Sequence, residues 1–200
     1  MDKADWDKRY AGSDLLWSVE PNRFLVEETA TLAPGRALDL AAGEGRNAIW
    51  LAEQGWNVDA VDFSPVALAK AQRLAQTRAV ELNWIEADVE QHPLADLEYD
   101  LAIVFYLHLP WERMRRVLHR ASAAVAPRGT LLLVGHDRTN LEQGHGGPKD
   151  RDVLYTPDQV AGELPGLLID EAARRERSVE TETGVVTAID CLVRASRSES

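Results

Sequence analysis

The sequence has a single cysteine, no long apolar run and fewer basic than acidic residues. Cys191 stands alone, which excludes an internal disulfide and zinc sites built on CxxC pairs. The longest apolar run, Leu101 to Leu107, falls far short of the roughly 18 residues that a membrane-spanning helix needs. Basic residues number 22 against 33 acidic ones, and the net charge of -11 repels a phosphate backbone. We therefore expect neither a membrane nor a nucleic-acid partner.

The start of the chain also lacks the pattern of a secretory leader. Met1 to Tyr10 is charged and has no apolar core, so we expect a cytoplasmic protein. The 200 residues are 45% apolar and 28% charged, which is ordinary for one globular domain. We expect residues 1–33 to form a helical cover within that domain, residues 34–195 to form its body, and residues 196–200 to be a frayed tail.

Short apolar runs alternate with helical patterns along the body of the chain. This alternation predicts an α/β protein with a mostly parallel sheet. The expected strands cover 37–41, 57–62, 81–86, 99–106, 130–134, 167–172 and 185–193. A polar, glycine-containing stretch at 138–155 interrupts the rhythm, and a loop of this length is typically a lid or a binding loop.

A glycine-rich loop follows the first expected strand. Gly43 to Ala48 reads GxGxxA and leads into a helix, and Asp62 ends the second strand 19 residues after Gly43. This is the spacing of a dinucleotide-binding fingerprint, in which glycines admit a ligand to the backbone and the acid binds ribose hydroxyls. The pattern predicts a nucleoside-containing cofactor. The alternative is a tight strand-to-helix turn with no ligand.

The charges around this loop distinguish between two cofactors. Glu44 lies in the loop and Asp39 four residues before Gly43, and no lysine offsets them. Two carboxylates repel the pyrophosphate of a nicotinamide cofactor, whereas they suit the cationic amine and sulfonium of S-adenosylmethionine. Arg46 is available for the carboxylate of that cofactor. The charges favour S-adenosyl-L-methionine; an NAD(P)-dependent oxidoreductase and a cofactor-binding sensor without turnover remain alternatives.

Three segments resemble motifs of a known family. Asp39 to Asn47 resembles motif I of the class I S-adenosylmethionine-dependent methyltransferases, Val61 to Pro65 resembles their second motif, and Glu86 to Val89 their third. The Gly-Arg-Asn ending of motif I is most similar to the tellurite-resistance and thiopurine-type small-molecule methyltransferases. The resemblance covers roughly residues 35 to 135. It implies a single Rossmann-like, doubly wound, mostly parallel seven-stranded sheet with an antiparallel last strand.

The resemblance also implies an activity and a set of binding residues. The activity is transfer of a methyl group to a small molecule, with release of S-adenosyl-L-homocysteine. The family pattern assigns the methionine end to Asp39 and Gly43, the ribose to Asp62, the adenine to Phe63, Asp88 and Val89, and the neighbourhood of the reactive methyl to Phe105. We add Ala41, Gly45 and Arg46 from the loop region to the expected cofactor-binding residues. No NPPY or DPPY motif follows the fourth strand, which disfavours the enzymes that methylate adenine bases or glutamine.

Histidines at two expected strand ends are candidates for the chemistry. His108 follows the fourth strand, and His136 follows the fifth with Asp137 beside it. Histidine suits a general base by its ordinary pKa, which an alcohol, phenol or amine acceptor needs and a thiol or metalloid oxyanion does not. Tyr106 joins them as a catalytic candidate, and Tyr106 and Trp17 are candidates to wall the sulfonium by cation–π contact. The alternative is ordinary packing and loop capping. We expect no metal site, and the oligomeric state is open.

Overall fold

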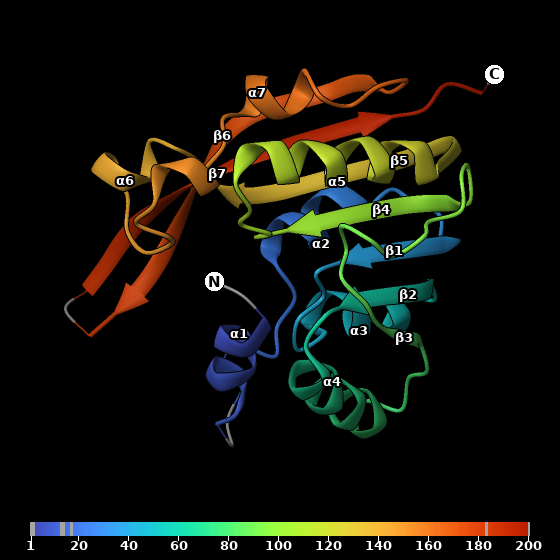
Figure 1. Ribbon diagram of the computed structural model, residues 1–200, viewed down its shortest axis with the longest axis horizontal. Coiled ribbons are helices and arrows are strands. Elements are labelled where there is room, and N and C mark those ends of the chain that lie inside the picture. Colours follow the sequence, from blue (N-terminus) through green and yellow to red (C-terminus); the bar gives the residue numbers. More distant parts are fainter. Residues whose placement is uncertain (1–2, 13–14, 17, 183, 200) are drawn as a thin grey trace. The chain divides into compact units, whose positions relative to one another are not determined.

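The computed structural model describes residues 3–12, 15–16, 18–182 and 184–199. Within them, seven strands form a sheet in the order β3-β2-β1-β4-β5-β7-β6 (Figure 1). The strands are β1 (Arg36–Leu40), β2 (Asn57–Asp62), β3 (Asn83–Glu86), β4 (Tyr99–Phe105), β5 (Val125–His136), β6 (Leu168–Thr181) and β7 (Gly184–Ser196). The helices are α1 (Lys3–Tyr10), α2 (Arg23–Thr29), α3 (Arg46–Glu53), α4 (Pro65–Thr77), α5 (Trp111–Ala124), α6 (Asn140–Gln143) and α7 (Pro157–Ala161), with a 3-10 turn η1 (Arg151–Val153).

Strand directions confirm the predicted fold class. β1 pairs with β2, and β2 with β3, in parallel. β7, the last strand, runs antiparallel to both of its neighbours, β5 and β6. The molecule is therefore an α/β protein with a mostly parallel seven-stranded sheet and an antiparallel last strand.

The chain divides into two compact units, which are described separately. Unit 1 is Met1–Pro93 with Glu98–Ile103, and unit 2 is Leu94–Leu97 with Val104–Ser200. Each unit has its own buried apolar side chains, such as Leu38 and Val61 in unit 1 and Leu118 and Leu132 in unit 2.

Local capping explains the helices of unit 1. Ser64 precedes α4, its hydroxyl accepts a hydrogen bond from the N–H of Ala67, and Pro65 takes the first helical position, as the sequence predicts. Asn22 caps α2 in the same way, accepting from the N–H of Phe24 at 2.9 Å. α1 packs beside α4, and its Lys3 pairs with Glu86 at the end of β3 at 2.9 Å.

Unit 2 differs from the sequence-based expectation in the length of its strands. β5 begins at Val125 rather than at residue 130, because the backbone of Arg197 hydrogen-bonds to that of Arg128 and Gly129 and ties the Pro-Arg-Gly segment into the sheet. β6 and β7 form a hairpin much longer than predicted, whose closed end projects away from α5 and α7 (Figure 1). Most of β6 is exposed or half-buried, so its sequence is polar and lacks the apolar alternation from which a strand is predicted.

The polar stretch 138–155 is a structured part of unit 2. It contains α6 and η1, and hydrogen bonds attach it to β7. The N–H of His145 donates to the carbonyl of Thr187 at 2.9 Å, and Asn140 Oδ1 accepts from the N–H of Ile189 at 2.7 Å. These bonds make the stretch a fixed neighbour of the hairpin in this structure.

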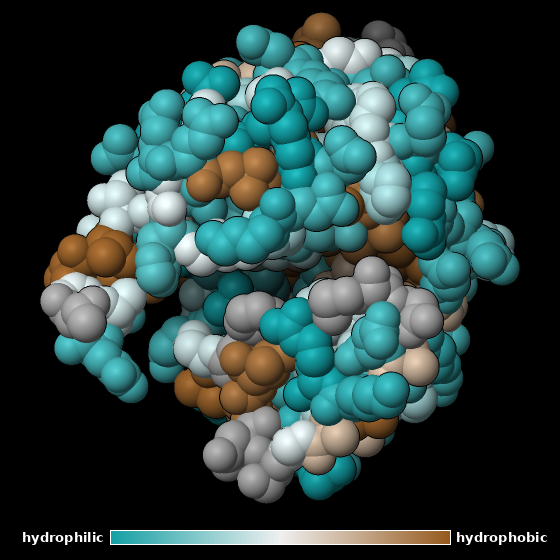
Figure 2. Space-filling view, turned by 60° about the vertical axis from the view of Figure 1, so that its left-hand side comes forward, coloured by the Kyte–Doolittle hydropathy of each residue, from teal (hydrophilic) through white to brown (hydrophobic). Residues whose placement is uncertain are grey.

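The surface agrees with the acidic composition. Figure 2 shows a face that is largely hydrophilic, with apolar residues in small separate patches. Among the described residues, no helix has the length and apolar character that crossing a membrane requires.

Candidate functional site

The glycine-rich loop of unit 1 is held by the acid that the spacing predicts. Asp62 Oδ2 accepts a hydrogen bond from the N–H of Gly43 at 2.8 Å, and Oδ1 accepts from the N–H of Ser64 at 2.9 Å. Ala41, Gly43 and Gly45 all have positive φ, so the chain turns tightly between β1 and α3. Burial raises the pKa of the Asp62 carboxyl, and the two hydrogen bonds oppose that rise. The loop and the acid thus form one preorganised element.

Asp39, at the end of β1, is a buried carboxylate with a free oxygen. It is only 1% exposed, and its Oδ2 has no hydrogen-bond partner among the described residues. Burial, and then the charge of Asp62, raise its pKa to about 7, while Arg46 and the N–H of Ala48 act in the opposite direction. A buried, under-paired carboxylate of this kind stabilises a cation placed against it.

The expectation that no lysine offsets the loop acids is wrong for Glu44. Lys70 reaches from α4 and its Nζ lies 3.1 Å from Glu44 Oε1, with both side chains largely buried. Glu44 Oε2 also accepts from the N–H of Leu16 at 2.8 Å. The pair could not be predicted from the loop sequence, because Lys70 belongs to the next helix, α4. The charge argument for the cofactor therefore rests on Asp39.

The remaining cofactor candidates lie in several places. Arg46 is the first residue of α3, and Phe63 directly follows Asp62 and is half-buried. Asp88 accepts from the N–H of Glu90 at 2.9 Å, and Val89 beside it is buried. Phe105 ends β4 and belongs to unit 2, and Trp17 lies outside the described residues. Their roles in binding stay predictions.

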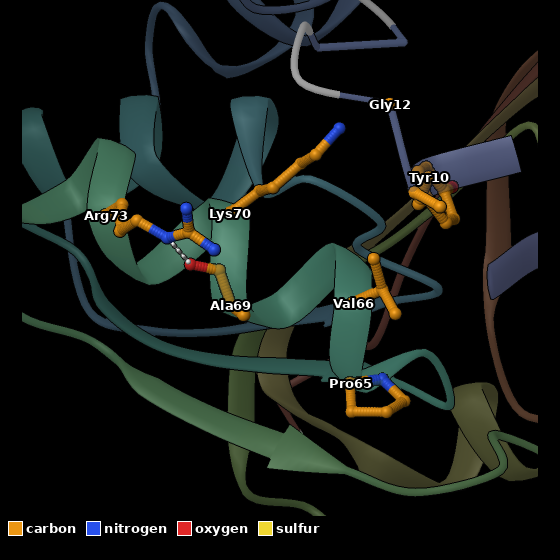
Figure 3. Close-up of a pocket in the computed structure, with 8 residues that line it drawn as sticks. Tyr10, Gly12, Pro65, Val66, Ala69, Lys70 and Arg73 are labelled. Atoms are coloured by element: carbon orange, nitrogen blue, oxygen red, sulfur yellow. Dashed lines mark hydrogen bonds between the residues drawn. The ribbon is translucent and has the colours of Figure 1, made fainter. Parts of the chain in front are cut away.

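A hollow of about 510 Å³ lies beside the loop, between the end of α1 and α4 (Figure 3). Its lining includes Tyr10, Gly12 and Lys70, but neither Asp39 nor Asp62. The Tyr10 hydroxyl would lie 3.1 Å from a Cβ placed on Gly43, so the end of α1 lies against the loop. We place the candidate cofactor site by the Asp62–loop geometry and not by this hollow.

Unit 2 brings together all three catalytic candidates. The rings of His108 and His136 stack with their centroids 5.5 Å apart and their planes 9° apart. The Tyr106 ring lies 5.0 Å from that of His136 and 6.3 Å from that of His108. Tyr106 holds a positive φ of 52°, an uncommon conformation for a bulky residue that is frequent at functional sites.

Asp190, which the sequence reasoning missed, connects this cluster. β5–β7 pairing places it opposite His136, and Asp190 Oδ1 lies 3.3 Å from His136 Nδ1, at ion-pair distance but not aligned as a formed hydrogen bond. The Tyr106 hydroxyl donates to Asp190 Oδ2 at 3.0 Å, and Arg177 Nε donates to the same oxygen at 2.8 Å. Burial alone would raise the pKa of Asp190, but its contacts with His136 and Arg177 outweigh burial and hold the pKa below its usual value.

One signal in the sequence pointed to Asp190. It stands in the apolar run of the last strand, where a charged residue at a buried position needs a partner. Asp137, the neighbour of His136 in the sequence, faces away and pairs with Arg174 at 3.0 Å. Cys191, the next residue of β7, is fully buried.

His108 also carries a buried polar atom without a hydrogen-bond partner among the described residues. Its Nε2 makes no hydrogen bond to any described residue. Burial, followed by the nearby His136, lowers the pKa of His108 to about 3, so this imidazole is neutral near pH 7. Within the described chain, no group of three or more His, Cys, Asp and Glu side chains is arranged to hold a metal ion.

Comparison with known proteins finds similarity to a methyltransferase domain over part of the chain. Residues 37–129 match the family model described as "Methyltransferase domain". Demethylmenaquinone methyltransferase of Thermus thermophilus is 33% identical over 125 residues, covering 62% of this chain and 55% of that protein. The chain spans about half the length of the curated relatives it matches.

Solved structures share the fold at low sequence identity. The protein in "Conversion of a Disulfide Bond into a Thioacetal Group during Echinomycin Biosynthesis" has a TM-score of 0.80 at 20% identity, over 99% of this chain and 92% of that one. The N-methyltransferase NodS of Bradyrhizobium japonicum, in complex with S-adenosyl-L-homocysteine, has a TM-score of 0.74 at 17% identity, over 98% and 97%. Residues 37–129 are thus similar to a methyltransferase domain, and nearly the whole chain shares the fold of these solved structures.

Proposed function

We propose that this chain transfers the methyl group of S-adenosyl-L-methionine to a small-molecule acceptor and releases S-adenosyl-L-homocysteine. The observation that carries the proposal is the 2.8 Å hydrogen bond from the Gly43 N–H to Asp62, which holds the acid expected to bind the ribose against the glycine-rich loop. The methyltransferase family match over residues 37–129 supports the same activity.

The residues present fit this cofactor better than a nicotinamide dinucleotide. Asp39 offers a buried oxygen without a partner, which suits the cationic amino group of S-adenosylmethionine. A pyrophosphate brought to the same loop would face that carboxylate. Lys70 neutralises Glu44, so the preference for the sulfonium cofactor comes from Asp39.

The chain's residues have separable roles in this proposal. When bound, S-adenosylmethionine supplies an already activated methyl group. Asp62 accepts hydrogen bonds from the ribose hydroxyls, using the lone pairs that Gly43 and Ser64 leave free on its two oxygens. Arg46 binds the cofactor's carboxylate. Tyr106, His108 and His136 act on the acceptor, and alignment of the acceptor contributes on the order of 7–11 kcal/mol to such a transfer.

The net charge supports a small-molecule acceptor, and the single cysteine supports a reducing compartment. A net charge of -11 disfavours nucleic acid as the acceptor, and the relative from Thermus thermophilus is named for demethylmenaquinone, a small molecule. The single, buried cysteine favours a reducing compartment, and we place the protein in the cytoplasm.

Calorimetric titration tests the cofactor directly. The purified protein is titrated with S-adenosylhomocysteine, NAD and NADP in parallel. We expect binding of S-adenosylhomocysteine alone, because it brings a cationic amino group to Asp39 where NAD and NADP bring an anionic pyrophosphate. Binding of NAD or NADP instead would overturn the proposal and make the protein an oxidoreductase.

Asp62→Ala is expected to weaken S-adenosylhomocysteine binding by about ten- to a hundredfold. The variant loses hydrogen bonds to a charged group, worth about 1.5–3 kcal/mol. Glu53→Gln, at the end of α3 and paired with Arg78, serves as the control and should bind like the wild type. Unchanged affinity in a folded Asp62→Ala protein would show that this strand end does not bind the ribose.

A further inference from the structure

The cluster around Asp190 has the connections of a positioned base. Nδ1 of His136 is buried against Asp190, so the 12% of the side chain that remains exposed lies on its other atoms. Asp190 is itself fully buried and is held by Tyr106 and Arg177 through its second oxygen. A carboxylate facing one imidazole nitrogen favours the proton on that nitrogen and leaves the other free to accept one.

The two charges of the Asp190–Arg177 pair offset each other. Asp190 carries one negative charge and Arg177, 2.8 Å away, one positive charge. His108 is neutral near pH 7, and the Tyr106 hydroxyl donates its hydrogen bond to Asp190. An ammonium acceptor therefore finds no free counter-charge in the cluster, and neither does an oxyanion. This balance favours an uncharged acceptor.

Three aromatic rings pack against one another in the cluster. His108 and His136 stack nearly parallel, and Tyr106 is tilted against His136 by 57°. Flat ring systems in such a cluster present faces and edges that pack well against another planar ring. The unpartnered Nε2 of His108 adds one polar atom that a bound hydroxyl can satisfy.

Resting on the proposed function, we propose that the acceptor is a neutral aromatic hydroxyl, with His136 as its base and Asp190 as the positioning residue of that base. The hydroxyl proton passes to Nε2 of His136 as the acceptor oxygen forms its bond to the methyl carbon. The carbon–sulfur bond breaks with its electron pair kept by sulfur, which leaves neutral S-adenosylhomocysteine. The histidinium, stabilised by Asp190, then releases its proton to water.

The tautomer of His136 provides a test that needs no acceptor. Two-bond ¹H–¹⁵N correlation spectra of protein labelled at histidine distinguish the Nδ1–H from the Nε2–H form, and His136→Gln identifies the His136 signals by their loss. We expect the Nδ1–H form in the wild type and a shift toward Nε2–H in Asp190→Asn. A wild-type Nε2–H form, or an unchanged tautomer in Asp190→Asn, would overturn the role of Asp190.

The acceptor class is tested with isotopically labelled S-adenosylmethionine and a panel of phenols, amines, thiols and metalloid oxyanions. We expect methylation of phenols on oxygen. Asp190→Asn should slow transfer to a phenol that is un-ionised at the assay pH by about tenfold or more, since that acceptor needs a base. Transfer to a substituted phenol already ionised at that pH should change little. An equal loss on both phenols would overturn the positioning role.

Asp137→Asn is the matched control for this comparison. Like Asp190, Asp137 is a fully buried carboxylate that pairs with an arginine of β6, here Arg174. Its ion pair with Arg174 does not involve His136. It should leave the ratio of the two phenol rates unchanged. Methylation confined to thiols, amines or oxyanions, or no methylation of any phenol while S-adenosylhomocysteine still binds, would overturn the acceptor class. Loss of S-adenosylhomocysteine binding by the wild type would instead refute the proposed function.

Discussion

Gly45→Ala is expected to lower the free energy of unfolding by about 2–4 kcal/mol. Gly45 stands before α3 at a φ of 79°, where an alanine is strained. A Cβ there would also lie 2.6 Å from the Trp84 ring and 2.9 Å from the Ala71 methyl, and Ala71 is fully buried. The strain and the overlap add, because neither neighbour moves without disturbing the packing of α4 against β3. Urea unfolding measures the change.

Two other glycines of unit 1 separate strain from overlap. Gly55 has a φ of 91°, but its nearest neighbour, Pro34, lies at 3.8 Å, so Gly55→Ala should cost only the strain, about 1–2 kcal/mol. Gly12 has open space and no positive φ, so Gly12→Ala should change stability by less than about 0.5 kcal/mol. Equal losses for Gly45→Ala and Gly55→Ala would show that the contact with Trp84 and Ala71 carries no cost.

The stability of the protein without ligand is expected to fall between about pH 4 and pH 7, with Asp39 contributing about 4 kcal/mol. Burial raises the pKa of Asp39 to about 7, so in this range the folded state binds a proton that the unfolded state has lost. The stabilisation is complete below pH 4 and disappears as the pH rises through 7. Asp39→Asn should remove this part of the pH dependence, measured by urea unfolding at several pH values.

Cofactor binding should reverse the protonation of Asp39. A cationic amino group beside the free oxygen favours the ionised carboxylate, so binding of S-adenosylhomocysteine below pH 7 should release up to about one proton. Calorimetry in buffers of different ionisation enthalpy counts this proton, and Glu53→Gln is the control that should release as much as the wild type. Proton release that persists in Asp39→Asn would assign the titration to another group.

The predictions for Gly45→Ala and for the titration of Asp39 concern the same short stretch of chain. Asp39, Gly43 and Gly45 lie within seven residues, and Asp62 fastens the stretch from the next strand. Asp62 thus holds the loop in place, and Asp39 beside it has an oxygen without a partner among the described residues, which a cationic ligand would satisfy.

The sequence by itself determined the elements that depend on local patterns. The run of β1, loop and α3, the position of Asp62 at the end of β2 and the cap at Ser64 follow from residues that are neighbours in the chain or in adjacent parallel strands. Hydrophobic periodicity, turn residues and capping residues act over a few positions, so one sequence suffices to find them. The α/β class and the mostly parallel sheet followed from the same signals.

Only the tertiary structure decided which charges meet. Lys70 neutralises Glu44 from another helix, and Asp190 reaches His136 through the register of β5 and β7. A shift of one residue in that register would turn Asp190 to the opposite face of the sheet, and nothing local in the sequence fixes it. The polar hairpin strand β6 was underestimated for a related reason, because exposure on both faces removes the alternation that marks a strand. Asp62 could thus be predicted from the sequence, whereas Asp190 becomes the partner of His136 only through long-range strand pairing.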